Sequence, residues 1–251
     1  MLKLLKIEYR KAISYSFAAV VFIIYFVSFT AFMAILAEGD IQFGNFTSSQ
    51  LFNLPNVWGY LAYIASFANW WFAIFIINNV CNEFQFRTFR QHIVDGLARN
   101  ELLLSKVLLV VMVCLLNVVY LCLAGTIFSA IYAQLFSFEG LFEQFYYLAL
   151  LFVNSFCYLT IAVIFALQFR KTAPTIILMV AYIFLFENIL GYIIGDVAKD
   201  YLPFKMIGNI LPFPMVKSPN KWLMASLVSL GYTILALTGG WAILKFRDLR
   251  S

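Results

Sequence analysis

Charged residues are scarce in this chain: they make up 12% of its 251 residues, whereas hydrophobic residues make up 64%. A soluble domain carries about a quarter charged residues, so this chain has too few polar side chains to cover a water-facing surface. A transmembrane β-barrel is also excluded, because apolar and polar residues do not alternate along the chain. These deficits predict an all-α integral membrane protein.

Motifs for nucleotide and catalytic chemistry are missing as well. No G-x-x-x-x-G-K-[ST] occurs to hold ATP phosphates, and neither H-E-x-x-H nor G-x-S-x-G is present. His92 is the only histidine and has no companion at metal-ligand spacing, so no metal site is expected. A membrane-embedded enzyme is therefore the least favoured class. The net charge of +5 requires no nucleic-acid partner, because the orientation of a membrane protein accounts for it.

Long runs with little or no charge predict six transmembrane helices. Each run exceeds the roughly 20 apolar residues that cross a bilayer core as a helix. The first is too long for the apolar core of a signal peptide and lacks a clear cleavage site, so we expect it to remain as a span. Residues 1–251 then form a single transmembrane domain, with approximate spans at 12–37, 57–81, 107–133, 145–169, 174–195 and 222–244.

The distribution of basic residues predicts the orientation of these spans. Most of the 17 Lys and Arg residues lie in the N-terminal segment, in 82–106, just after the fourth span and in the C-terminal tail. The loops at 38–56 and around Glu139 contain none. Because Lys and Arg concentrate in cytoplasmic loops, both termini and the 82–106 loop are expected in the cytoplasm.

Two further segments outside the spans have a distinctive pattern. Residues 1–14 place Leu2 and Leu5 on one helical face and Lys3 and Lys6 on another, which predicts an amphipathic interfacial helix on anionic lipid. An ordinary basic flank is the alternative. Residues 196–221 on the outer side combine four prolines with many large apolar residues, which predicts a re-entrant or interfacial segment between the last two helices.

The loop between the second and third spans is the most charged part of the sequence. Phe86, Phe89, Ile93 and Leu97 recur at helical spacing and form one apolar stripe. This pattern predicts a short amphipathic coupling helix whose apolar side rests on the membrane domain and whose polar side faces the cytosol. We expect Asn100 to cap the helix that follows.

The same loop carries a recognisable motif. Residues 82–106 contain a glutamate, an aromatic residue, a threonine with a basic residue soon after, then a glycine, an arginine, an acidic residue and a closing lysine: Glu83, Phe84, Thr88, Arg90, Gly96, Arg99, Glu101 and Lys106. In this order they resemble the cytoplasmic loop of type-2 (ABC-2-like) ABC transporter permeases. The run 202–212, LPFKMIGNILP, is similar to the outer segment before the last helix of that family. Arg87 stands where many members have a glycine.

The resemblance implies a permease subunit of an ATP-driven exporter in the bacterial cytoplasmic (inner) membrane. It would pair with a second permease, identical or different, and with two cytoplasmic ABC ATPase subunits that bind the ATP and Mg²⁺. The chain itself would bind no cofactor. Its substrate would be a hydrophobic or amphipathic lipid, drug or peptide. The residues implied in ATPase docking are Glu83, Arg87, Thr88, Arg90, Gln91, Arg99 and Glu101. A non-transporting anchor or regulatory subunit with the same fold is the alternative.

Polar residues within the spans are the remaining candidates. Glu187 is the only ionisable residue inside a predicted span, where a charge is costly, and Gly191 lies one turn further on the same face. We expect Glu187, Gly191 and Asn69 either in a substrate path or at a dimer interface. A protonated Glu187 bonded to a neighbouring helix and a role in proton coupling are the alternatives.

Overall fold

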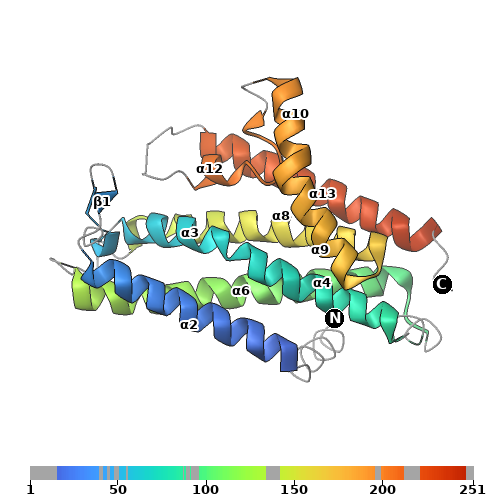
Figure 1. The fold of residues 1–251 in the computed structure, drawn as a ribbon, viewed down its shortest axis with the longest axis horizontal. Coiled ribbons are helices and arrows are strands. Elements are labelled where there is room, and N and C mark those ends of the chain that lie inside the picture. The colour runs from blue at the N-terminus through green and yellow to red at the C-terminus, as the bar shows by residue number, and fades with distance from the viewer. Residues whose placement is uncertain are drawn as a thin grey trace.

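The computed structural model describes residues 16–39, 42–43, 46–47, 51–54, 56–86, 88, 91, 96–133, 142–195, 199–211 and 221–246. All long elements in these ranges are helices (Figure 1). Backbone polar groups have no water to bond with inside a bilayer, and a helix satisfies them within its own segment. The elements are α2 (Ser16–Glu38), α3 (Val57–Phe67), α4 (Asn69–Gln85), α6 (Arg99–Tyr132), α8 (Tyr146–Phe169), α9 (Thr172–Ala181), the π-helical turn η2 (Tyr182–Phe186), α10 (Glu187–Ile194), α12 (Ile207–Ile210) and α13 (Lys221–Phe246), with a two-residue antiparallel pair, β1 (Gln42–Phe43) and β2 (Phe46–Thr47).

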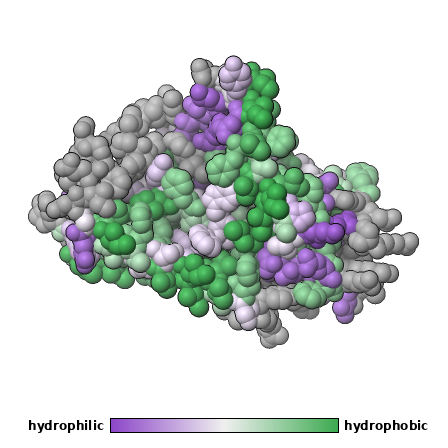
Figure 2. All heavy atoms as spheres, in the orientation of Figure 1, coloured by the Kyte–Doolittle hydropathy of each residue, from purple (hydrophilic) through white to green (hydrophobic). Residues whose placement is uncertain are grey.

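The expectation of an all-helical chain is confirmed, and its long apolar helices are compatible with a multi-pass membrane protein. Within the described ranges, five helices are long and apolar enough to cross a membrane, and the count is six if the bent pair α3 and α4 forms one span. The bend between these two helices is 43°. Figure 2 shows a largely hydrophobic face, with hydrophilic residues gathered beside α10 and near the end of the bundle where α4 ends. Such a surface suits a protein that is solvated mainly by lipid.

Helix α8 is the centre of the bundle and contacts α3, α4, α6 and α13 (Figure 1). In its most apolar stretch 61% of the residues are buried, compared with 17% for the span formed by α9, η2 and α10. The span formed by α9, η2 and α10 crosses the outside of the bundle, and α10 projects from the bundle (Figure 1). This span is therefore the least buried of the five candidate spans in the described ranges.

Helix α2 is attached to the bundle through aromatic packing and one polar contact. Tyr25 lies edge-on to Phe72 of α4 and to Tyr120 of α6, with ring centroids 4.8 Å and 5.7 Å apart. Its hydroxyl donates a 2.6 Å hydrogen bond to Asn117 Oδ1. Asn117 therefore fixes a contact between helices, which is the usual role of a polar side chain inside a membrane bundle.

The helix bounds differ from the sequence prediction in three spans. The predicted span 57–81 is two helices that end at Gln85, and the predicted span 174–195 contains a π-helical turn. The span predicted to begin at residue 107 begins at Arg99. Hydropathy detects only the apolar part of a helix, and α6 continues beyond it toward the loop. Asn100 is not the cap: the backbone N–H of Ala98 donates to Glu101 Oε2 over 2.9 Å instead.

Several predicted features fall on parts of the chain outside the described residues. These are the interfacial helix at 1–14 and most of the coupling helix between α4 and α6. The ends that are described, at the start of α2 and the end of α13, both point toward the end of the bundle where α4 ends (Figure 1). An even number of spans would give this arrangement of the two ends.

Part of the predicted outer segment is described, at 199–211. Five of its large apolar side chains are buried, namely Leu202, Phe204, Met206, Ile210 and Leu211. Phe204 lies edge-on to Tyr158 of α8, with ring centroids 4.6 Å apart. The segment is thus packed onto the bundle, and its position places two lysines beside α10.

Candidate functional site

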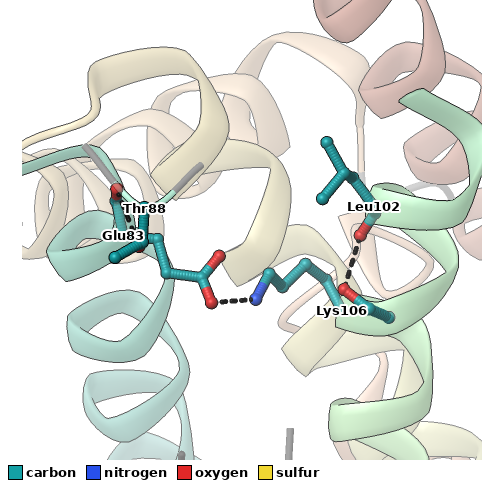
Figure 3. Close-up of polar contacts among 5 residues, drawn as sticks. Glu83, Thr88, Leu102 and Lys106 are labelled. Atoms are coloured by element: carbon teal, nitrogen blue, oxygen red, sulfur yellow. Dashed lines mark hydrogen bonds and ion pairs between the residues drawn. The ribbon is translucent and has the colours of Figure 1, made fainter. Parts of the chain in front are cut away.

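The end of α4 and the start of α6 meet at the base of the 86–98 loop, and a buried ion pair joins them. Lys106 Nζ lies 2.7 Å from Glu83 Oε1, and the lysine and glutamate side chains are only 1% and 6% exposed. Figure 3 shows the two side chains extending toward each other from the two helices. Each charge offsets part of the cost of burying the other, and separating the two would leave both buried without a partner, so the pair ties α4 to α6 where the loop begins and ends.

Neighbouring contacts extend this pair into the loop and into a third helix. Thr88 Oγ1 donates to the carbonyl oxygen of Glu83 over 3.3 Å (Figure 3). The Arg170 guanidinium, at the end of α8, lies 5.2 Å from the centre of the Phe84 ring. Arg170 itself adopts a left-handed backbone conformation with φ of 58°, which ends α8 and turns the chain into α9. The base of the loop therefore contacts α4, α6 and the α8–α9 turn together.

The start of α6 is also tied to the last helix of the chain. Arg99 Nη1 donates to the carbonyl oxygens of Leu244 and Lys245 over 2.8 Å and 2.6 Å. These carbonyls belong to the last turn of α13, and carbonyl oxygens in the last turn of a helix have no backbone N–H partner within that helix. Trp241 Nε1 donates to Asn100 Oδ1 over 2.9 Å. A displacement of the loop exit would therefore be transmitted to α13.

The predicted docking residues fall into three groups in the structure. Gln91, Arg99 and Glu101 are exposed. Glu83 is 5% exposed, so it is not available for direct contact with a partner, and its carboxylate pairs with Lys106 instead. Thr88 is partly buried and bonded to the loop base. The other two docking candidates, Arg87 and Arg90, lie outside the described residues.

The apolar stripe expected along the loop is only partly described. Phe86 is 64% exposed, so its predicted burial against the membrane domain is wrong. The physical reason is that α4 ends at Gln85 and Phe86 forms its C-cap, which takes Phe86 out of the helical register assumed for the stripe. Leu97 is half-buried, and Phe89 and Ile93 lie outside the described residues.

Glu187 and Gly191 share a face of α10 that packs against the chain's own 199–206 segment. Glu187 is fully buried, and its Oε1 accepts a 3.0 Å hydrogen bond from the backbone N–H of Phe204. A Cβ at Gly191 would lie 3.2 Å from Lys199 Cβ and 3.2 Å from Lys205 Nζ. Both residues of α10 therefore hold the outer segment in place rather than facing away from the subunit.

Asn69 lies apart from this pair, at the bend between α3 and α4. Its side chain is fully buried, and neither amide atom has a hydrogen-bond partner in the described structure. The adjacent Trp70 stacks on Phe184 of η2 with ring centroids 6.0 Å apart, which is one contact between this bend and the α9–α10 span. Buried amides are almost always bonded, so Asn69 marks a place where a water or a polar ligand group would be stabilised.

Sequence reasoning did not assign a role to four residues that the structure places at these sites. Lys106 is the closing lysine of the motif and directly precedes the predicted third span, so it looks like an ordinary flanking charge until α6 is seen to begin at Arg99. Arg170 follows a span and looks like any basic flank. Lys199 and Lys205 look like ordinary charges of an outer loop. Their convergence depends on the fold of 199–211, which the sequence pattern did not define.

Neither a protein-family model nor a curated protein matches this chain. Within the described residues no group of three His, Cys, Asp or Glu side chains is placed to hold a metal ion. The polar contacts at the base of the 86–98 loop and around Glu187 of α10 are therefore the candidate functional features.

Proposed function

We propose that this chain is the membrane-spanning permease subunit of an ATP-driven ABC exporter of the type-2 class. In this proposal it pairs with a second permease and with two separate cytoplasmic ABC ATPase subunits, and it moves a hydrophobic or amphipathic substrate such as a lipid, drug or peptide. It has no catalytic residues of its own, and ATP and Mg²⁺ are bound by the ATPase. The membrane is the bacterial cytoplasmic membrane.

One observation carries the proposal: the motif that resembles the permease loop has its two terminal charges, Glu83 and Lys106, closed into a buried ion pair. A loop that only connected two spans would need no buried charges, which are costly in a membrane protein. An ion pair at the base makes sense if the loop must keep its shape while a partner pushes on it. The exposed side chain of Gln91 remains available to that partner. Arg99 and Glu101 are exposed too, but they already bond to α13 and to the Ala98 N–H.

The contacts around the loop base could also transmit a movement of the ATPase to the transmembrane helices. Arg99 connects the loop exit to the last turn of α13, and Arg170 connects the α8–α9 turn to Phe84 at the loop entry. In this proposal, closure of the ATPases moves the loop as a unit and tilts α4, α6 and α13 together. Tilting of these helices would open a path between the two permeases.

Site-specific crosslinking tests the docking surface. A photo-crosslinking amino acid at Gln91, which is exposed on the loop, should capture a nucleotide-binding ATPase subunit in native membranes. The matched control is the same amino acid at Glu143, which is exposed beyond the other end of α8 and should capture no such subunit. Capture of the ATPase equally from both positions, or from neither, would refute docking through this loop.

Reconstitution separates a transporter from the alternative of an anchor or regulator. In proteoliposomes containing the permease and the captured ATPase, a transported amphiphile should stimulate ATP hydrolysis and accumulate on one side of the membrane. The variant Glu83→Gln should reduce transport more than basal hydrolysis, because it loosens the loop base without touching the ATPase. ATP hydrolysis with no movement of any amphiphile would favour the anchor.

A further inference from the structure

The buried carboxyl group of Glu187 has one oxygen that the described structure leaves unsatisfied. Its Oε1 accepts the 3.0 Å hydrogen bond from the backbone N–H of Phe204. Its Oε2 is buried and has no hydrogen-bond partner. Lys205 attracts the carboxylate electrostatically, but this attraction leaves Oε2 without a hydrogen bond. Because buried polar atoms are almost always bonded to protein or to ordered water, Oε2 requires a partner of its own.

The hydroxyl group of Tyr158, on the central helix α8, is unsatisfied in the same region. Tyr158 is 4% exposed, and its Oη is buried without a hydrogen-bond partner. Its ring lies edge-on to Phe204, the residue whose N–H bonds to Glu187. The Tyr158 hydroxyl and the Glu187 carboxylate interact electrostatically, yet neither Oη nor Oε2 has a partner within hydrogen-bond distance. The two groups therefore face a common space without bonding to each other directly.

The chemistry of the two groups matches the hydrogen bonds of one water molecule. A carboxylate only accepts hydrogen bonds, whereas a tyrosine hydroxyl also donates. A water that accepts the Tyr158 O–H and donates to Glu187 Oε2 would satisfy both atoms. Buried waters typically make about three hydrogen bonds, and the hydroxyls of Tyr182 and Tyr232 also interact electrostatically with Glu187. Helices η2 and α13 therefore offer the further partner.

The packing around Phe204 limits the size of the ligand. The rings of Tyr158 and Tyr182 lie edge-on to Phe204, with centroids 4.6 Å and 5.7 Å from its own. Aromatic side chains thus enclose the space that the polar atoms face. Such an enclosure suits a ligand with a single oxygen atom better than a larger polar molecule.

We infer that Tyr158 and Glu187 bind a buried water molecule, which bridges Tyr158 Oη and Glu187 Oε2. The water connects the central helix α8 to α10, which projects from the bundle (Figure 1). The other oxygen of the same carboxyl group holds Phe204 of the outer segment. One side chain thereby joins three parts of the protein. The inference goes beyond the proposed transport function, because the water site requires neither ATP nor a partner subunit.

X-ray footprinting of the full-length protein in detergent tests the inference. X-rays convert water to hydroxyl radicals, and a buried aromatic ring is oxidised efficiently only where a water lies beside it. Phe204 is the reporter, and Phe29 is the matched comparison because both are 6% exposed. The Phe29 ring packs on Tyr25 and Tyr120, whose hydroxyls have hydrogen-bond partners within the protein. Mass spectrometry should show faster oxidation of Phe204 than of Phe29.

The variant Tyr158→Phe tests whether the oxidation of Phe204 depends on the proposed site. It keeps the ring that packs on Phe204 and removes the hydroxyl that binds the water, so Phe204 should be oxidised as slowly as Phe29. Tyr120→Phe is the control, because it removes a hydroxyl that already donates to the carbonyl oxygen of Phe26. This control should leave the oxidation of Phe204 unchanged. Circular dichroism checks that both variants are folded.

Two results would overturn the inference. Equal oxidation of Phe204 and Phe29 in the wild type would show that no water lies beside Glu187, as expected if the Tyr158 hydroxyl bonded to Oε2 directly. This comparison depends on no variant. Unchanged oxidation of Phe204 in Tyr158→Phe would show that the radicals come from bulk water and not from a water held by Tyr158.

Discussion

Replacing Glu83 by glutamine should be costly, because it leaves Lys106 charged at 1% exposure with no carboxylate beside it. Removing one partner of a buried ion pair typically costs about 3–5 kcal/mol. Lys106→Met should cost a similar amount by leaving Glu83 unpaired. The double variant Glu83→Gln/Lys106→Met contains no buried charge, and it should be close to neutral because a polar or apolar replacement of a buried pair often is.

The measurement is the free energy of unfolding in mixed micelles of detergent and SDS, followed by circular dichroism for the wild type, both single variants and the double variant. With both single variants costing about 3–5 kcal/mol and the double variant near neutral, the cycle should give a coupling energy of about 6–10 kcal/mol in magnitude. Glu101→Gln is the control, because this exposed glutamate retains an acceptor for the Ala98 N–H after substitution. A coupling energy below about 1 kcal/mol, the value for an exposed pair, would refute the buried geometry.

Two further predictions concern packing and topology. Gly125→Ala should destabilise the bundle by about 1–3 kcal/mol through overpacking, because a Cβ there would lie 2.7 Å from Trp58 Cζ3; Gly231→Ala, with nothing within 4 Å, should be neutral in the same unfolding assay. Equal effects would contradict the close packing of α3 on α6. Cysteine substitutions at Gln91 and Glu143 should be labelled by impermeant maleimide only from the cytoplasmic and outer sides respectively. Labelling of both from one side would contradict the orientation.

The spans were predictable because the hydropathy of a helix depends only on its own residues. Most predicted helices lie within a few residues of their positions in the structure. The bend between α3 and α4 was not predictable, since neither Pro nor Gly occurs at Ala68–Asn69 to indicate it. The early start of α6 was missed for a different reason. Arg99 and Glu101 look like loop residues by charge, yet one bonds to α13 and the other caps α6.

The candidate sites were only partly predictable, because their key contacts join residues that are distant in sequence. Glu83 and Lys106 were both recognised within the motif, but their burial depends on the packing of α4 beside α6. Glu187 was identified correctly as unusual, since a carboxyl in a span needs a partner. Its partner is the backbone of Phe204, and a backbone group has no signature in the sequence.

The π-helical turn at Tyr182–Phe186 determines where the carboxyl of Glu187 points. A π-turn accommodates one residue more than an α-helical turn, and each residue of an α-helix advances the chain by about 100° around the axis. Everything beyond the turn is therefore rotated by roughly that angle relative to α9. Without this offset the Glu187 side chain would swing away from the Phe204 N–H and toward the hydrocarbon. The additional residue of the π-turn thus rotates α10 so that the Glu187 carboxyl stays inside the protein. Deleting one residue of η2 would remove this rotation.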